Sequence, residues 1–477
     1  MAPALIVPPP WATIGHPMMT TSEAQSAPTY EQRRSLGSRR ILRTWWPLAA
    51  SWILMGFEGP AISAIVSRLS EPKVNLAAYG GLVFPLALMI EAPIIMMLAA
   101  STALCRDWAS YVKLRRFMNR LGAVLTVLHV IMVGTPVYYL VTRSIIHAPE
   151  EIIGPARIGL LIMIPWTWAI AYRRFHQGVL IRFGHSLTVG LGTGVRFVAD
   201  ATVLAVGYFI GGIPGVAVAA CALVTGVLTE ALYVHLTVRK TLRNELKPAP
   251  VVQRPLSTRA MLDFYIPLSL TQLLVIVASP IGSAAMSRMP LALESLAAWP
   301  VVSGISYIVR GFGGAYNEVV VALVEERRAP RALRRFAVGL AVLATAALMV
   351  LMIPSLANAI FSGLLDLADP LPDMVRRSLF FLLPMPAMAV IQSYFQGAIL
   401  HSRNTRSITE SVGMFLAVVT VTLVGGVLWG TAAGLYVALG AFAAGESLRT
   451  FWLWLRSRRA RRQLREGDAD ASVPAPY

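Results

Sequence analysis

The chain has 477 residues, of which 56% are hydrophobic and only 14% are charged, and its mean hydropathy is +0.63. This balance excludes a soluble globular protein of this length and indicates a protein with many membrane-spanning segments. The formal net charge of +18 suggests a nucleic-acid partner, but the positive residues lie in alternate loops between apolar stretches, so we expect none.

Apolar stretches of roughly 20 residues, the length that crosses a bilayer, recur along the chain. In chain order they are 45–66, 76–104, 120–142, 155–171, 184–209, 214–236, 262–286, 294–323, 336–360, 374–400, 408–429 and 431–455. The sequence therefore predicts an all-α integral membrane protein with twelve transmembrane helices in two lobes of six. The predicted boundaries are a disordered tail at 1–40, lobes at 41–240 and 261–456, a basic linker at 241–260, and a basic then polar tail at 457–477.

The loops on one side of these stretches are rich in arginine, whereas the loops on the other side are short or acidic. By the positive-inside rule both termini are cytoplasmic. Arginine far outnumbers lysine, which favours a GC-rich bacterial genome. We therefore expect a multi-pass protein of a bacterial cytoplasmic (inner) membrane, a monomer whose partners are lipid and a small molecule.

The second half of the chain repeats the first at a shift of about 220 residues. Shared landmarks include Pro47 with Pro267, Ser67-Arg68 with Ser287-Arg288, Pro165 with Pro384, and Gln177-Gly178 with Gln396-Gly397. So many matches at one offset indicate a duplication. Because each repeat holds an even number of spans, the halves are related by a pseudo-two-fold axis along the membrane normal, an architecture typical of transporters that work by alternating access.

Motifs for other functions are missing from the sequence. There is no GxxxxGK[ST] phosphate loop, so the chain does not hydrolyse ATP at a Walker site, and neither HExxH nor a nucleophile–base arrangement occurs. The two cysteines, Cys105 and Cys221, are too few for a metal cluster. We expect neither an enzyme nor a cofactor or metal, and energy drawn from an ion or substrate gradient.

Charged residues at membrane depth are costly and mark pathways or ion pairs. The candidates for the substrate or ion pathway are Glu58, Glu91, Arg196, Asp200, Arg310 and Glu318. Arg196 and Asp200 are four residues apart on one helix face, so they either neutralise each other or line the pathway. Glu91 and Arg310 are repeat equivalents of opposite sign, and they either close one side of the pathway together, meet an ionic substrate, or are unrelated buried charges.

Polar residues near the helix ends have two interpretations each. Arg68 and Arg288 lie at the outer ends of helices 1 and 7, where they either reach toward lipid headgroups or form a ring of positive charge at an outer mouth. Gln177 and Gln396 recur near the cytoplasmic ends of helices 4 and 10, where they either hydrogen bond a substrate or join helices. Asn317 beside Glu318 is a further pathway candidate, and Pro165 and Pro384 predict kinks in helices 4 and 10.

Several stretches resemble a known transporter family. LAAYGGLVFPL at 76–86, HQGVLIRFGHSLTVG at 176–190, PLSLTQLLVIVASPIGSAAMSR at 267–288 and AGESLRTFWLW at 444–454 look most like the progressive ankylosis (ANKH-type) family. That family belongs to the multidrug/oligosaccharide-lipid/polysaccharide (MOP) superfamily, which includes the MATE exporters. The resemblance implies a MATE-like fold and export of small polyanions such as citrate, inorganic pyrophosphate or a nucleotide.

Three transporter functions remain open at this point. The first is export of a small organic or phosphorylated anion, suggested by Arg68, Arg196, Arg288 and Arg310 and by the family resemblance. The second is a MATE-like H⁺- or Na⁺-coupled multidrug cation antiporter, in which Glu58, Glu91 or Glu318 holds the cation. The third is a flippase for a lipid-linked oligosaccharide.

Overall fold

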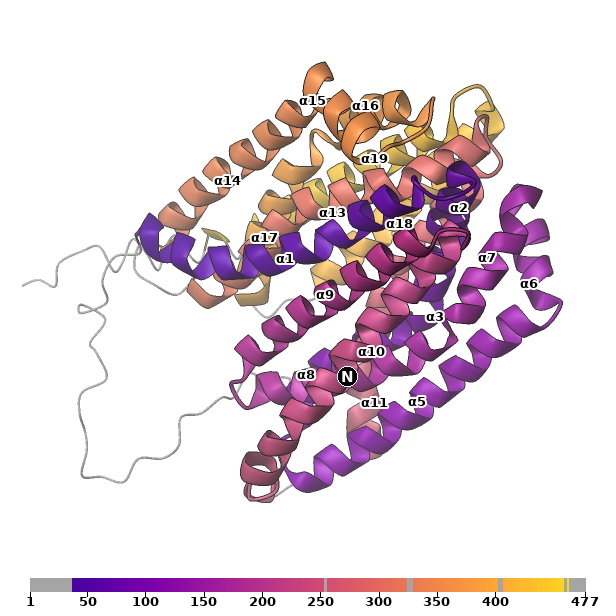
Figure 1. The fold of residues 1–477 in the computed structure, drawn as a ribbon. Helices are drawn as coiled ribbons and strands as arrows, with labels where there is room; N and C mark the ends of the chain where they lie inside the picture. The colour runs from indigo at the N-terminus through magenta and orange to yellow at the C-terminus, as the bar shows by residue number, and fades with distance from the viewer. Residues whose placement is uncertain (1–36, 253–254, 324–328, 402–405, 459–460, 463–477) are drawn as a thin grey trace, which may run out of the picture.

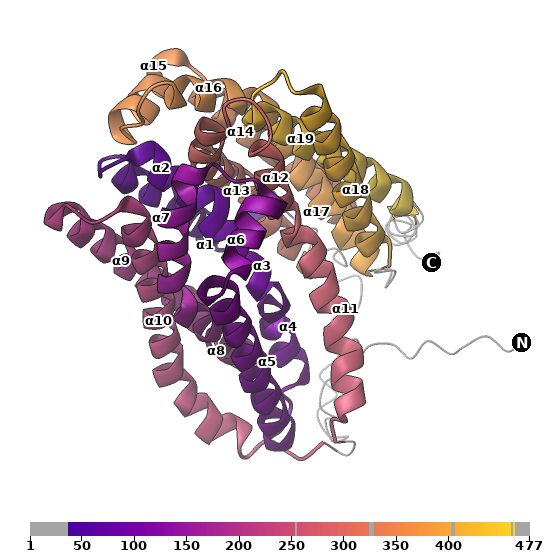
Figure 2. The same ribbon diagram turned by 90° about the vertical axis from the view of Figure 1, so that its right-hand side faces the viewer.

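The computed structural model describes residues 37–252, 255–323, 329–401, 406–458 and 461–462, and within them all regular structure is helical. Figures 1 and 2 show two groups of antiparallel helices, one from each half of the chain, lying side by side. The all-helical, two-lobed architecture predicted from the sequence is confirmed.

Each half contributes six membrane-crossing segments. Those of the first half are α1 (Ser38–Val66); α2 (Pro72–Ala77), η3 (Ala78–Val83), α3 (Phe84–Ile95) and α4 (Met97–Leu104); α5 (Trp108–Gly134); α7 (Glu150–Ile162) and α8 (Ile164–Arg182); α9 (Ser186–Ile210); and α10 (Gly215–Thr241). Those of the second half are α11 (Thr258–Ile276) and α12 (Ala278–Met286); α13 (Ala292–Leu323); α14 (Ala329–Leu351); α16 (Leu371–Leu382) and α17 (Met385–His401); α18 (Arg406–Trp429); and α19 (Gly434–Arg456). In the part of the chain that the structure describes, nine of these segments are long and apolar enough to cross a membrane, and the bent pair α7 and α8 makes a tenth. α1 and α19 complete the twelve.

Prolines interrupt the fourth and tenth spans, as predicted. α7 and α8 meet at an angle of 44°, with Pro165 in the first turn of α8. Pro384 lies in the break between α16 and α17. A proline ring removes a backbone donor and clashes with the preceding turn, so a helix bends or restarts at such a residue.

The expected spans 120–142 and 336–360 are wrong at their outer ends. There α5 and α14 end earlier, and a separate short helix follows each of them. α6 (Val137–Tyr139) continues into η4 (Leu140–Ile146), and its repeat counterpart α15 (Pro354–Asn358) continues into η6 (Ala359–Leu364). Pro136 and Pro354 stand where these short helices begin, so the long helices end before them. The membrane crossings lie further toward the cytoplasmic side than the apolar stretches suggested.

The connector between the lobes is shorter than the predicted linker 241–260. α10 continues as η5 (Leu242–Leu246), and α11 begins at Thr258. The connector is held against the start of α5, where the side chain of Asp107 caps the helix and also accepts a hydrogen bond of 3.2 Å from the amide of Val252. Lys113 of α5 donates to the carbonyl of Leu256 at 2.6 Å.

The structure reproduces the sequence repeat in its hydrogen bonds. The first turn of α10 is held by the side chain of Asn75, whose Oδ1 accepts from the amide of Val216 at 3.0 Å. The first turn of α19 is held in the same way by Ser295, whose Oγ accepts from the amide of Leu435 at 3.1 Å. Each final helix is thus anchored to the start of the second span of its own lobe.

The lobes meet along α1 and α13, where glycines allow a close approach. A Cβ atom added at Gly56 would lie 2.4 Å from Cγ1 of Ile308, and one added at Gly304 would lie 2.7 Å from Cδ of Pro60. Small residues are the usual means by which membrane helices pack closely. We call this contact the glycine seam.

A second contact between the lobes joins α11 to α3. The hydroxyl groups of Tyr265 and Ser269 both donate to the carbonyl of Pro93, the latter at 3.4 Å. That carbonyl accepts side-chain donors because the helix around Pro93 is locally interrupted. Near the outer side, a Cβ added at Gly80 of η3 would lie 2.2 Å from Cγ of Pro300 in α13, so these elements also touch across the interface.

Candidate functional site

Arg196 of α9 is the centre of a buried polar cluster in the first lobe. Its Nη2 lies 2.5 Å from Oε2 of Glu58 in α1, and its Nε lies 3.9 Å from Oδ2 of Asp200 and 4.0 Å from Oε2 of Glu230 in α10. The predicted pair of Arg196 and Asp200 is therefore part of a larger set, and the shortest contact of the arginine is with Glu58. We call this set the N-lobe cluster.

Glu230 links α10 to α8 in the same cluster. Its side chain is fully buried and forms an ion pair with Arg173, while its Oε1 accepts a hydrogen bond of 2.8 Å from Nε2 of Gln177. Burying a carboxylate is costly unless it is paired and hydrogen bonded, and Glu230 is both. In this structure Gln177 joins two helices.

The N-lobe cluster fits against α10 because residue 226 is glycine. A Cβ added at Gly226 would lie 1.7 Å from Oδ1 of Asp200. The equivalent Gly445 in α19 faces Val419 and Phe415 of α18 instead, with a Cβ 2.8 Å and 2.9 Å from them. The two lobes share this close helix contact, but only the first lobe places charges in it.

A second polar cluster, the C-lobe cluster, surrounds Glu446 of α19. Its Oε1 accepts from Nη2 of Arg310 in α13 at 2.6 Å, and its Oε2 accepts from Nε2 of Gln392 in α17 at 2.8 Å. Nη1 of Arg449 is 3.6 Å from the same carboxylate. At 38%, the side chain of Arg310 is far more exposed than that of Glu446, at 4%.

Two further predicted residues lie close together beside the C-lobe cluster. Nδ2 of Asn317 in α13 donates to Oε1 of Gln396 in α17 at 3.0 Å, so Gln396, like Gln177, joins neighbouring helices here. The side chain of Glu318 lies outside the described residues.

The structure does not bring Glu91 and Arg310 together, although they are equivalent in the repeat. Arg310 pairs with Glu446 inside its own lobe. Glu91 of α3 is fully buried in the first lobe, beside the hydroxyl of Thr167 and within electrostatic range of Arg173 and Arg174, and neither of its oxygens meets a donor in strict hydrogen-bond geometry among the described residues. The idea that the two residues close the pathway as a pair is not supported by this conformation.

Arg68 connects the outer end of α1 to the opposite lobe. Its Nη2 donates to the carbonyls of Leu364 at 2.6 Å and Gly363 at 3.3 Å, at the end of η6, and its Nη1 donates to Ala64 of its own helix. The neighbouring hydroxyl of Ser67 donates to the carbonyl of Leu365. The last carbonyls of a helix have no partner within it, and a cation there also interacts favourably with the helix dipole.

Arg288 makes the reciprocal connection from α12 to the first lobe. Its Nη1 donates to the carbonyl of Ile146 at 2.7 Å, and its Nη2 donates to the carbonyl of Ile145 and lies 2.7 Å from Nδ1 of His147. These atoms end η4, the counterpart of η6. We call these two arginines, together with the helix ends that they cap, the outer clasp. Neither interpretation of Arg68 and Arg288 from the sequence included this role.

Arg174 was not singled out from the sequence, yet it faces the other lobe from α8. Its Nε is buried, and among the described residues the guanidinium has no ion pair or hydrogen bond. It lies within electrostatic range of Tyr307, one turn before Arg310 on α13. Nε of Arg449 is also buried without a partner. The apolar stretch 155–171 ends before Arg173 and Arg174, so the sequence placed both in a basic loop, whereas the structure places them inside α8.

Comparison with known proteins identifies the fold. No protein-family model matches the sequence, and no curated protein matches it either. An inward-facing MATE-family multidrug resistance transporter of the MOP superfamily has a TM-score of 0.60 at 16% identity, covering 87% of this chain and 96% of that one. A MATE structure in a bent conformation has a TM-score of 0.58 at 19% identity, covering 91% and 98%.

A third similar structure is a MOP superfamily transporter from Pyrococcus furiosus, with a TM-score of 0.58 at 18% identity, covering 90% of this chain and 96% of that one. It is described as having a binding pocket of reverse polarity that suggests a different function. These similarities show that the chain has the fold of MATE transporters, with twelve helices in two lobes. The resemblance to the progressive ankylosis family stays a prediction.

Proposed function

We propose that the protein is a secondary-active transporter that works by alternating access and carries a small organic or phosphorylated anion between its lobes. The fold supports the transport mechanism, because the similar structures include MATE transporters described in inward-facing and outward-facing conformations. The anion is supported by the polar groups where the lobes face each other.

The single observation that carries the anion is that guanidinium donors of α8 and of the C-lobe cluster are left without an acceptor among the described residues. Arg174 has no partner among the described residues, and Arg449 has a buried Nε without one. Arg310 keeps more than a third of its side chain exposed, whereas the Glu446 carboxylate beside it accepts one hydrogen bond on each oxygen and also pairs with Arg449 at 3.6 Å. Guanidinium groups can only donate, and they bind carboxylate and phosphate oxygens in bidentate fashion.

The conformation of the structure supports the same mechanism. The outer clasp joins each lobe to the other, and η3 touches α13 near the same side. The state that opens outward requires the clasp to break.

Flux measurements in proteoliposomes test this function. We expect uptake of labelled citrate or pyrophosphate under an imposed proton, sodium or anion gradient, and we expect Arg310→Gln and Arg174→Gln to lower it. Arg376→Gln is the matched control, because Arg376 is an arginine of α16 that pairs with Asp373 at the surface. No flux of either anion under any gradient would overturn the proposal, and unchanged flux in both interface variants would refute the assignment of the site.

A MATE-like antiporter that exchanges a lipophilic cation for H⁺ or Na⁺ is the second candidate. It is favoured by Glu91 and by Asp200, whose buried oxygens have no hydrogen-bond donor among the described residues. Resistance of cells to lipophilic cations on overexpression, lost in Glu91→Gln, would support the antiporter and contradict the anion carrier. No observation in the described residues favours the oligosaccharide flippase.

The remaining expectations are parts of the same proposal. We place both termini in the cytoplasm because arginine is concentrated in alternate loops. The excess of arginine over lysine favours a bacterial inner membrane, and we expect a monomer. Labelling of single cysteines introduced into the two tails, with a reagent that does not cross membranes, checks this orientation. Labelling of either tail in intact cells would contradict it.

A further inference from the structure

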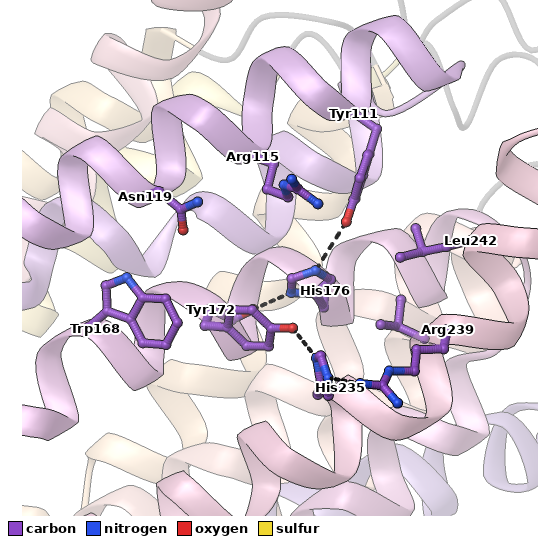
Figure 3. Close-up of a pocket in the computed structure, with 10 residues that line it drawn as sticks. Tyr111, Arg115, Asn119, Trp168, Tyr172, His176, His235, Arg239 and Leu242 are labelled. Atoms are coloured by element: carbon purple, nitrogen blue, oxygen red, sulfur yellow. Dashed lines mark hydrogen bonds between the residues drawn. The ribbon is translucent and has the colours of Figure 1, made fainter.

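A cavity separate from the lobe interface opens among the cytoplasmic ends of α5, α8 and α10. It has a volume of about 250 Å³. Its walls come from the first lobe only, and include Tyr111, Arg115, Asn119, Trp168, Tyr172, His176, His235 and Arg239 (Figure 3). The clusters described above contribute no residue to these walls, so the cavity plays no part in the proposed transport site.

The hydrogen bonds in the cavity fix the protonation of both histidines. Nη2 of Arg239 lies 2.7 Å from Nε2 of His235 and can only donate, so this nitrogen is an acceptor and the proton is on Nδ1, which bonds the hydroxyl of Tyr172. Nδ1 of His176 donates to the carbonyl of Tyr172 at 2.9 Å, and its Nε2 therefore accepts from the hydroxyl of Tyr111 at 3.4 Å. Figure 3 shows this chain of contacts.

The charged groups of the cavity, and the hydroxyl of Tyr172, can still donate hydrogen bonds to a ligand. Because Tyr172 accepts a hydrogen bond from His235, its own proton is free to be donated. Arg115 and Arg239 have no carboxylate partner among the described residues, and the residues that line the cavity include no aspartate or glutamate. Two guanidinium groups and a phenol donor without an acidic residue favour an anion with several oxygens, of which phosphate is the common biological example.

The position of the cavity favours a lipid as the source of that phosphate. On α10, Leu232 and Leu236 are exposed on the turns before Arg239, so one helix face changes from apolar to basic. On α5, Val127 and Val130 are exposed deeper in the membrane than Arg115, and Trp168 of α8 is exposed between the two helices. A face of this kind crosses from the hydrocarbon to the headgroup region, and basic pockets between helices at this depth suit anionic headgroups.

We propose that this cavity binds the phosphate group of an anionic phospholipid from the cytoplasmic leaflet, held between Arg115 and Arg239 with Tyr172 as a further donor. The lipid chains then lie along the exposed apolar faces of α5 and α10. The site is separate from the transport pathway and does not depend on which substrate is carried.

Native mass spectrometry of the purified full chain tests the proposal. We expect phosphatidylglycerol to be retained in preference to the zwitterionic phosphatidylcholine, and Arg115→Gln/Arg239→Gln to lower that retention by about tenfold, as loss of charge-assisted bonds predicts. Arg116→Gln/Lys240→Gln is the matched control, because it removes the same charge one residue further along the same helices and outside the cavity. We expect the control pair to retain phosphatidylglycerol as the unmodified protein does.

Two other results would overturn the proposal. Equal losses in both double variants would mean that diffuse surface charge attracts the lipid and that the cavity does not bind it. Displacement by inorganic phosphate at low concentration, with no preference between the two lipids in the unmodified protein, would assign the cavity to a free anion. The comparison of lipids needs no variant, so it remains decisive if a variant fails to fold.

Discussion

The outer clasp makes a prediction about the balance between the two states of the transporter. Arg68 and Arg288 each donate to two carbonyl groups of the opposite lobe. Replacing both with alanine removes these bonds and leaves each lobe's own helices intact. We expect the double variant to spend more time open on the outer side.

The size of the effect follows from the number and exposure of the bonds. A hydrogen bond from a charged donor contributes about 1.5 to 3 kcal/mol. Both arginines are partly exposed, so water can take over the hydrogen bonds to the carbonyl groups once the arginine is removed. We therefore assign about 1.5 kcal/mol to all the cross-lobe bonds of each arginine, which is the lower limit of the range for one such bond. At about 1.4 kcal/mol per tenfold change, one variant shifts the ratio of closed to open states by about tenfold and both by about a hundredfold.

Distances between spin labels at the outer ends of the lobes measure this shift. Glu151 at the start of α7 and Ser355 at the start of α15 are exposed, so cysteines at these positions can carry the labels in a background without Cys105 and Cys221. We expect the distance distribution to gain a longer component in the double variant.

Arg143→Ala is the control for these measurements. Arg143 also lies in η4, but it pairs with Glu150 of its own lobe at the surface, so its loss leaves the cross-lobe bonds in place. An unchanged distribution in the double variant, or an equal change in the control, would refute the reasoning.

Two further predictions concern the N-lobe cluster and the connector. Gly226→Ala forces a Cβ against the carboxylate of Asp200 and should stop transport, whereas Gly445→Ala meets Val419 and Phe415 but no charged group and should keep it, with each costing about 1 to 3 kcal/mol of stability; equal transport by the two variants would contradict a role for the cluster. Burial raises the pKa of Asp107, but hydrogen bonds from Ser110 and Val252 lower it more, so its net pKa is below the ordinary 3.8. The cap therefore contributes fully at neutral pH, and its contribution declines as the pH falls from 3.8 through the lower pKa of the folded state, so Asp107→Ala should cost about 1 kcal/mol of stability at pH 7 and less at pH 3, measured as the loss of apparent Tm at each pH; an equal loss at both pH values would refute this.

The repeat and the helical spans were predictable because they depend on local properties of the chain. Apolar length identified the spans, and the recurring Pro165 and Pro384 located the breaks in two of them. The short outer helices were missed because η4 and η6 are as apolar as the spans that precede them. They are separate helices because a proline stands where each one begins, and hydropathy averaged along the chain does not detect a proline.

The partners of the buried charges could not be predicted from the sequence. Arg310 was compared with Glu91 because the repeat aligns them, but its carboxylate is Glu446, which is 136 residues away on another helix. Which charges meet depends on how each helix is rotated about its axis, and that rotation is set by packing across the whole lobe. The recurrence of positions in a duplicated chain therefore predicted the helix breaks at Pro165 and Pro384 better than it predicted ion pairs.

The glycine seam also determines how the two lobes can move against each other. Side chains that interlock as ridges and grooves must climb over one another when helices slide. At Gly56 and Gly304 one partner in the contact is backbone, so at these two positions a displacement moves only the side chain of Ile308 or of Pro60. The glycine seam is therefore suited to let one lobe turn against the other while the outer clasp opens and closes.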